Sequence, residues 1–286
     1  MRGRENGFGL VGVVLIVTAL AGVCLAGWRV LGSKDTSKNN TSSATQQASS
    51  DNKAAKSNQS VMWSTDGSGN WRAMQGTPPT CPKQPMLKSP TSLSQVTSIL
   101  YPGQTRGGNY KPHGGFRFDN VTDNKVAVTA PMDAYIYRGA RYLVDGEVQY
   151  TFDFVNSCGI MYRLGHLLVL TPKYQALADA FPPAQEGDSR TTNINSVVNV
   201  KTGEQIATKV GVTVGGVNTF FDLGVYDLRS SNQASKDTSY VQQRGLELAG
   251  HAVCWLKGWL PNTDEAKINS LPAGDPTSGK NSDYCN

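Results

Sequence analysis

The stretch Asn109-Tyr-Lys-Pro-His113-Gly-Gly-Phe-Arg117-Phe-Asp119 leads from a turn into strand-like alternation, and the rest of the chain reads as scaffold around it. Its histidine is one of 3 in the chain. The pair Gly114-Gly115 lets the backbone turn sharply or approach another group closely. A histidine at such a turn serves as a metal ligand, as a general base or as a hydrogen-bonded turn residue. The stretch alone leaves these three roles open.

The sequence that follows predicts successive β-strands. Residues 126–129 and 134–140 are short β-rich runs, and the turn Ala130-Pro131-Met132-Asp133 between them predicts a hairpin-like unit. Residues 146–155 and 159–170 are aromatic and β-branched, which predicts a second strand pair. One or two helical turns are expected at 172–180. Short turns and few helices together predict a mainly β domain built on an antiparallel sheet.

The order of these motifs resembles the lysostaphin/LytM-type zinc endopeptidases, which cut peptide cross-links in bacterial cell walls. The resemblance spans residues 109–229 of 286. After the His-x-Gly stretch and the x-Val-x-Val-x-Ala-Pro strand, three later segments look like the family's landmarks: Tyr162-Arg-Leu-Gly-His166-Leu, Gly203-Glu-Gln-Ile-Ala-Thr-Lys-Val-Gly211, and Phe221-Asp222-Leu-Gly224-Val-Tyr226. It implies a LytM-like β domain with a groove that holds His113, His166 and Tyr162.

The family's zinc ligands are replaced at two of their three positions. By this resemblance the first ligand is His113, the aspartate four residues later is Arg117, and the final histidine is Gly224, with Asp222 as the other member of the His-x-His pair. A guanidinium has no lone pair for a metal, and glycine has no side chain. We therefore expect a domain that has lost its zinc and is not a peptidase, with His113 and His166 in the catalytic positions.

A rearranged zinc site is the alternative. Asp119 shares the strand face of His113 if alternation continues, and His166 and Asp222 are further candidates to converge on it. The simpler arrangement pairs Arg117 with a carboxylate beside two hydrogen-bonded histidines. Arg117, Asp119, Asp222 and Tyr162 are then ligand-groove candidates.

The N-terminal residues predict a membrane anchor. Phe8 to Trp28 contains no charged residue and is long enough to span a bilayer as a helix, so residues 1–31 are expected to form a single transmembrane helix. A prepilin-type leader at Gly7-Phe8 is a second reading, although Gly12 stands where that leader has a glutamate. A lipoprotein site at Cys24 is a third, although Val23 is bulky. Flanking charges give a mild preference for a cytoplasmic N-terminus.

A tether and a Pro-rich lead-in are expected between the anchor and the β domain. Residues 32–62 are rich in Ser, Thr, Asn and Lys and predict a disordered linker, and 63–108 predict an irregular lead-in. Of the formal net charge of +5, the anchor and the linker each carry +2, which leaves +1 for residues 63–286. The basic charge therefore lies near the membrane, and no nucleic-acid footprint falls on the folded part.

Cysteine usage favours an extracytoplasmic domain. Four cysteines lie outside the anchor, which permits two disulfides, with Cys254–Cys285 the first expectation and Cys81–Cys158 the remaining pair. The first would tie down a C-terminal extension, residues 230–286, in which Trp255 and Trp259 have helical spacing and a short helix follows at 264–271. His251 has no motif around it and is expected to be structural.

Two classes of function follow from the sequence. The first is a membrane-anchored, non-catalytic, extracytoplasmic module that binds peptidoglycan or a cell-wall hydrolase and needs no cofactor. The second is a divergent zinc metallopeptidase that uses His113, Asp119 and Asp222 as ligands. A pilin-like surface subunit is a further alternative that rests on the leader alone.

Overall fold

The computed structural model describes residues 61–245 and 247–285. Its strands are β1 Met62–Thr65, β2 Trp71–Gln75, β3 Ser98–Leu100, β4 Gln104–Arg106, β5 Asn109–Lys111, β6 Gly114–Arg117, β7 Lys125–Thr129, β8 Ala134–Val144, β9 Glu147–Val155, β10 Ile160–Leu170, β11 Thr192–Asn193, β12 Asn199–Val200, β13 Gln205–Val210 and β14 Phe220–Asp227. Its helices are α1 Pro172–Ala178, α2 Thr238–Arg244 and α3 Asn262–Ser270, with 3₁₀ turns η1 Ala234–Lys236 and η2 Ala249–His251. The expected anchor at 1–31 and nearly all of the linker at 32–62 lie outside the described residues. Within the described part, no helix has the length and apolarity to cross a membrane.

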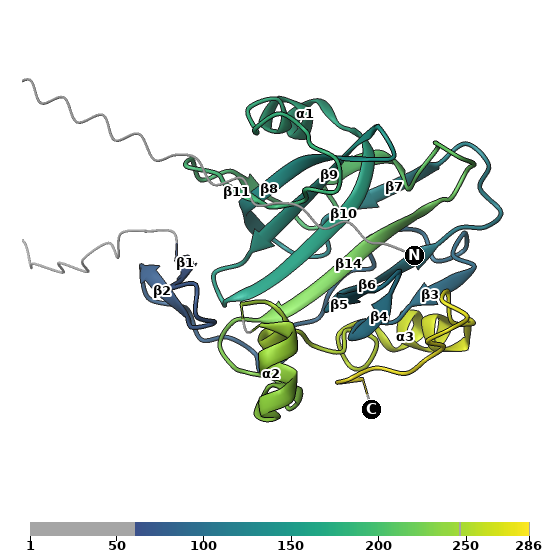
Figure 1. Cartoon of the computed structure of the whole chain (residues 1–286). Helices are drawn as coiled ribbons and strands as arrows, with labels where there is room; N and C mark the ends of the chain where they lie inside the picture. Colours follow the sequence, from purple (N-terminus) through teal and green to yellow (C-terminus); the bar gives the residue numbers. More distant parts are fainter. Residues whose placement is uncertain (1–60, 246, 286) are drawn as a thin grey trace, which may run out of the picture. The chain divides into compact units, whose positions relative to one another are not determined.

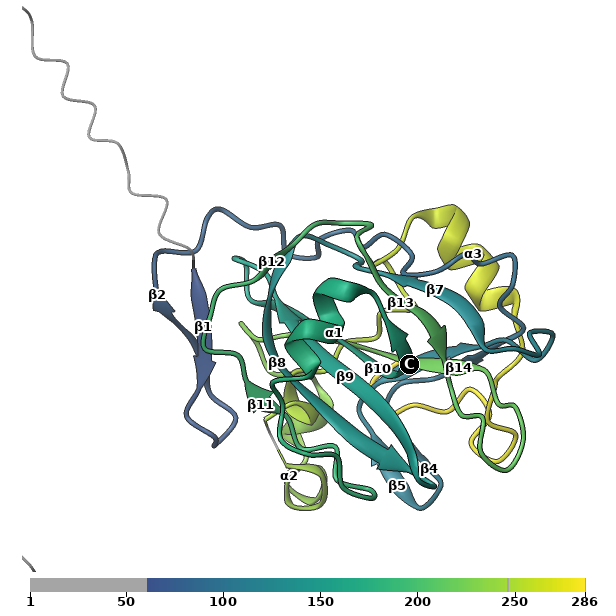
Figure 2. The same cartoon turned by 90° about the horizontal axis from the view of Figure 1, so that it is seen from above.

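One antiparallel sheet organises the described residues, as the sequence predicts. Its main path runs β11-β8-β9-β10-β14-β6-β3 (Figure 1), and β13 joins β10 to β7 (Figure 2). The long strands β8, β9, β10 and β14 are rich in aromatic and β-branched residues, which suit a pleated surface covered on both sides.

Alternation, interrupted by register shifts in β8 and β10, divides the side chains of the long strands between two faces of the sheet. Tyr162 and Leu164 on β10 and Phe152 and Phe154 on β9 point to the larger core, where α1 packs through Tyr174. Figure 2 shows α1 lying across these strands. The α2 helix lies on the other side of the sheet in Figure 1.

The second face carries a smaller core and a polar strip beside it. Met161, Val155, Tyr135 and Tyr226 form one cross-strand row of this face. The β1–β2 hairpin covers this row with Trp63 and Trp71, and a segment of the C-terminal extension adds Ala252. The next row toward the opposite end of the strands remains polar and forms part of the candidate site.

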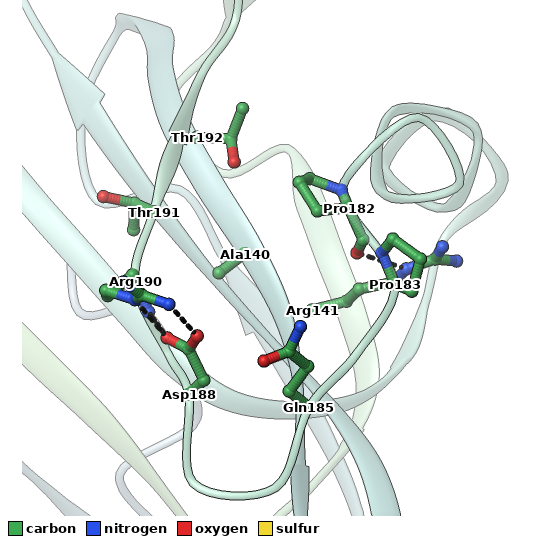
Figure 3. Close-up of a pocket in the computed structure, with 9 residues that line it drawn as sticks. All are labelled: Ala140, Arg141, Pro182, Pro183, Gln185, Asp188, Arg190, Thr191 and Thr192. Carbon is green, nitrogen blue, oxygen red and sulfur yellow. Dashed lines mark hydrogen bonds and ion pairs between the residues drawn. The ribbon is translucent and has the colours of Figure 1, made fainter. Parts of the chain in front are cut away.

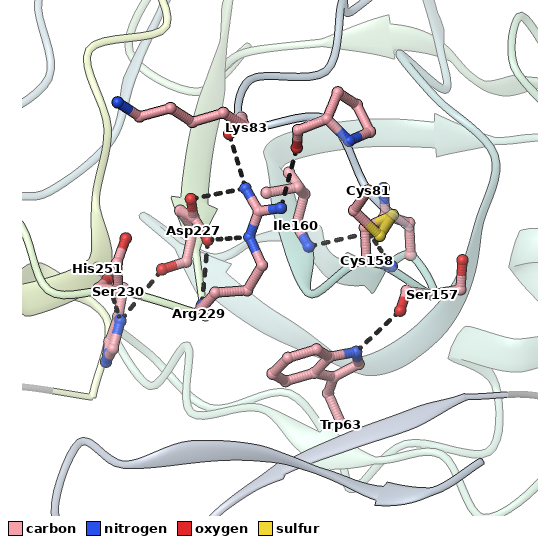
Figure 4. Close-up of polar contacts among 12 residues, drawn as sticks. Trp63, Cys81, Lys83, Ser157, Cys158, Ile160, Asp227, Arg229, Ser230 and His251 are labelled. Atoms are coloured by element: carbon pink, nitrogen blue, oxygen red, sulfur yellow. Dashed lines mark hydrogen bonds and ion pairs between the residues drawn. A yellow bond between two sulfur atoms is a disulfide. The ribbon is translucent and has the colours of Figure 1, made fainter. Parts of the chain in front are cut away.

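Both expected disulfides are present, Cys81–Cys158 and Cys254–Cys285. The first ties the lead-in to the β9–β10 turn, next to the Trp63 indole, which donates to the Ser157 carbonyl (Figure 4). Arg229 adds to this attachment, since its guanidinium pairs with Asp227 and donates to the carbonyls of Pro82 and Lys83.

Four sequence expectations about elements are wrong. The lead-in at 63–108 is not irregular throughout, because it holds the β1–β2 hairpin and the strands β3 and β4. β7 and β8 form no hairpin, because β7 pairs with β13 and β8 with β9. Trp255 and Trp259 lie in irregular backbone, where turns carry both side chains into the larger core. The last helix begins at Asn262, with Pro261 as its N-cap, rather than at residue 264. The β9–β10 pair and α1 are confirmed.

Candidate functional site

A polar band crosses the second face of the sheet. We use this name for two adjacent groups of side chains: Arg138, Asp153 and Arg163 in one cross-strand row, and His113, His166 and Asp222 beside it. The row is in register, because Arg163 pairs with Gly224 and Asp153, and Arg138 pairs with Asp153. Asp222 lies opposite Gly165 and Gly115, two residues further along each strand.

Asp222 is the centre of the second group. Its Oδ2 lies 3.1 Å from His113 Nε2 and 3.5 Å from His166 Nε2. All three side chains are largely buried, with 11%, 12% and 21% of the side chains of Asp222, His113 and His166 exposed. Neither ring nitrogen of His113 makes a hydrogen bond within the described residues. The contact between His113 Nε2 and Asp222 Oδ2 is therefore close but not aligned as a hydrogen bond.

Close backbone approach explains the glycine pair that follows His113. A Cβ at Gly114 would collide with the Leu100 carbonyl on β3, and one at Gly115 would collide with the Phe221 carbonyl on β14. Both glycines are therefore required by tight strand packing on each side of β6. That packing places His113 beside Asp222.

A bulge brings His166 to the polar band. Alternation from Leu164 would turn residue 166 into the larger core, but His166 has a φ of 57° and the pairing with β9 shifts between Leu164 and Leu167. The extra residue rotates the imidazole to the second face, where its ring lies 4.5 Å from that of Phe220. A non-glycine residue in this backbone region is uncommon and tends to occur at functional positions.

The tautomer of His166 follows from its neighbour. His166 Nδ1 lies 2.6 Å from Gln149 Oε1, and the Gln149 amide is oriented because its Nε2 donates to the Gly211 carbonyl at 2.9 Å. The amide oxygen only accepts, so Nδ1 carries the proton. In the neutral ring, Nε2 then presents a lone pair toward Asp222.

Electrostatics favours an ionised Asp222 next to a neutral His166. Burial raises the pKa of Asp222, but the Arg106 guanidinium and the positive charge that His113 and His166 carry in acid more than offset this, so its pKa lies well below the usual range. Burial lowers the pKa of His166, and the Asp222 charge opposes that shift only in part. The site thus offers two hydrogen-bond acceptors side by side, which is suited to an ammonium or amide N–H of a ligand.

The neighbouring row offers donors instead. Asp153 is fully buried and accepts from Arg138 Nε at 2.7 Å and from Arg163 Nε and Nη2 at 2.7 Å each. Burial raises the pKa of Asp153, but the two guanidinium groups outweigh it and keep the pKa below its usual range. One carboxylate therefore orients two arginine forks, and Arg138 Nη1 also donates to Glu247 Oε1 at 2.6 Å.

Other residues expected in the groove lie elsewhere. Asp119 follows the end of β6 and turns back to Thr97 and to Arg117, whose guanidinium lies 3.0 Å away, so strand alternation does not carry Asp119 to His113. Tyr162 points into the larger core and stacks on Phe154 at 4.6 Å. The Tyr226 ring occupies the space above Gly224.

The centre of the polar band carries ligand types that occur in zinc sites. Two imidazoles and a carboxylate are suitable ligand types. Among the described residues, no group of three or more His, Cys, Asp or Glu side chains has the geometry to hold a metal ion.

Sequence reasoning missed the arginine row, Gln149 and Arg106. Each belongs to the site through cross-strand register or through a loop contact, as Arg106 does by donating to the His113 carbonyl at 3.0 Å. Charged residues inside predicted strands, such as Arg138 and Asp153, were the available signal.

Comparison with known proteins adds no relative. No protein-family model matches the chain, and neither a curated protein nor a solved structure matches it.

Proposed function

We propose that this chain is a membrane-anchored, extracytoplasmic, LytM-like module that binds the peptides of peptidoglycan without cleaving them. The observation that carries the proposal is the polar band. Its two acceptors at Asp222 and His166 lie two residues along the strands from the arginine donors, a separation of about 7 Å. A peptide that bears an N–H or ammonium group and a carboxylate has complementary groups at this spacing.

The two disulfides support the extracytoplasmic part of this proposal. Disulfides form and persist in oxidising compartments. The anchor expected at residues 1–31 and the linker at 32–62 would hold the sheet at the membrane surface, within reach of the wall. A wall hydrolase whose surface peptide meets the same band is the alternative partner.

Cosedimentation with purified bacterial cell-wall sacculi tests the proposal. The full chain should sediment with sacculi and release no soluble wall fragments. Asp222→Asn removes the charge of the acceptor pair and should abolish most of the sedimentation. Asp119→Asn is the matched control, because that carboxylate lies off the polar band and is half exposed. Equal sedimentation of the two variants, or none by the parent chain, would refute the proposal.

A divergent zinc peptidase is the second candidate. It is favoured by the approach of two imidazole nitrogens to one carboxylate oxygen at 3.1 and 3.5 Å. Because Asp119 is turned away, His166 would have to replace it as the third ligand. The ring of Tyr226 over Gly224, where the resemblance places the final ligand, counts against it.

Metal analysis separates the two candidates. The non-catalytic module should purify with no more zinc than its His113→Ala variant. Stoichiometric zinc that is lost in His113→Ala, together with cleavage of wall peptides that a chelator stops, would establish the peptidase instead.

A further inference from the structure

An arginine-rich cavity opens next to the polar band. It has a volume of about 660 Å³ and is lined by Arg138 and Arg163 of the sheet, by Arg190 and by Arg244 at the end of α2. Its other polar lining residues are Tyr110, Ser189, Thr191, Gln243 and Glu247. Arg190 also borders a smaller cavity of about 280 Å³, where Asp188 pairs with it (Figure 3).

The arginines around the larger cavity differ in whether a carboxylate pairs with them. Asp153 lies behind Arg138 and Arg163, Glu247 Oε1 lies 2.6 Å from Arg138 Nη1, and Asp188 pairs with Arg190. Three of the four guanidinium groups that line the cavity therefore have a carboxylate at ion-pair distance. Arg244 stacks over the Tyr110 ring at 4.2 Å, and no acid within the described part of the chain lies at ion-pair distance from it.

The donors are oriented before any ligand arrives. Arg138 and Arg163 have only 12% and 20% of their side chains exposed, and the fully buried Asp153 fixes both forks. A preoriented fork loses little side-chain entropy on binding a planar anion. Glu247 already places a carboxylate on Arg138, which indicates the geometry that these donors accept.

We propose that this cavity binds the carboxylate of a peptide ligand, with Arg138 and Arg163 as the oriented donors and Arg244 as the cation without an acid partner. Glu247 then acts as an internal competitor that a bound carboxylate displaces from Arg138. Identification of the ligand as a wall peptide rests on the proposed function, whereas the preference for a carboxylate does not.

Calorimetric titration of the purified full chain tests this inference. The probes are an N-acetylated stem-peptide fragment with a free C-terminal carboxylate, the same peptide with an amidated C-terminus, and inorganic phosphate. The free acid should bind at least tenfold more tightly than the amide, which is the expected effect of losing one charge-assisted interaction. Equal binding of acid and amide, or tighter binding of phosphate than of the acid, would overturn the proposal.

Two substitutions should shift the affinity in opposite directions. Arg244→Gln removes the cation and should weaken binding of the free acid about tenfold, whereas Glu247→Gln should strengthen it. Arg141→Gln is the matched control. Arg141 lies on β8 with Arg138, but it lines only the smaller cavity and donates to the Pro182 carbonyl. Arg163→Gln is avoided because it leaves Asp153 poorly compensated. An unchanged affinity in Arg244→Gln with an unchanged thermal midpoint would contradict the assignment.

The two proposals fail separately. Sedimentation with sacculi that depends on Asp222, combined with equal binding of acid and amide, would reject the carboxylate cavity alone. Discrimination between acid and amide by a chain that does not sediment with sacculi would reject the wall function alone.

Discussion

Asp153 shows how one residue determines the character of a whole sheet face. It is the only carboxylate in its cross-strand row and accepts from both flanking arginines. Cross-strand neighbours of opposite charge stabilise a sheet modestly when exposed, but a buried pair that loses one partner is costly. Asp153 therefore stabilises the fold and also orients the two arginines that line the cavity.

Asp153→Asn should lower the free energy of unfolding by about 3–5 kcal/mol at pH 7, because two buried guanidinium groups lose their counterion. The folded-state pKa is depressed, so the stabilisation is present above the unfolded pKa of about 4 and is lost as pH falls through the folded value. Urea unfolding from pH 7 to pH 3 should show the difference between parent and variant shrinking below about pH 4. Asp123→Asn, which breaks the exposed pair with Lys125, should leave the midpoint unchanged.

Two glycines in the row of Asp222 should respond differently to alanine. Gly115→Ala places a methyl group against the Phe221 carbonyl and should cost about 1–3 kcal/mol or more. Gly165→Ala meets Thr151 Oγ1 at 3.4 Å, an ordinary contact, and should change stability by less than about 1 kcal/mol. Thermal unfolding of both variants checks the contrast, and equal losses would show that β6 and β14 adjust to a side chain.

At the scale of elements, the sequence predicted correctly those features that depend on residues close together in the chain. The tight turn at Asn156 to Gly159 set the β9–β10 pair, and Pro172 set the start of α1. The partner of β7 is β13, more than 70 residues away, and nothing in the sequence of β7 specifies it. The bulge at His166 likewise depends on the strands that pair with both sides of β10. The preceding Gly165 was the one local sign of irregular backbone at this position.

The docking of the β1–β2 hairpin depends on His251. Its Nε2 lies 2.6 Å from the Gly69 carbonyl in the hairpin turn, and its Nδ1 lies 2.8 Å from the Ser230 carbonyl. His251→Ala should therefore destabilise the fold by about 2 kcal/mol through lost buried hydrogen bonds. Hydrogen exchange should locate the added exposure in β1, β2 and the Trp71 indole, which donates to the Glu247 carbonyl. Uniform exchange across the sheet would contradict a local role.

Across the whole molecule, the candidate site was predictable only in part. The motif resemblance selected His113, His166 and Asp222, which lie together, but it also selected Tyr162, which does not join them. Strand alternation selected Asp119, which turns away from them. A strand residue reaches a site only if its face, its register and the end of its strand all agree. Sequence alternation supplies the first of these and leaves the other two to tertiary pairing.

One disulfide ties the lead-in to the β9–β10 turn and the other closes a loop within the C-terminal extension, and the two should contribute comparably to global stability. They close loops with sequence separations of 77 and 31 residues, and chain entropy predicts a loss of about 4 kcal/mol when either is removed. Cys81→Ser/Cys158→Ser and Cys254→Ser/Cys285→Ser should each lower the denaturant midpoint. Only the second pair should also loosen the segment at Tyr284, whose hydroxyl donates to the Pro112 carbonyl next to His113. Weaker sedimentation with sacculi in that variant alone, at a temperature where both variants remain folded, would link the C-terminal extension to the polar band. Equal sedimentation would restrict this disulfide to a stabilising role.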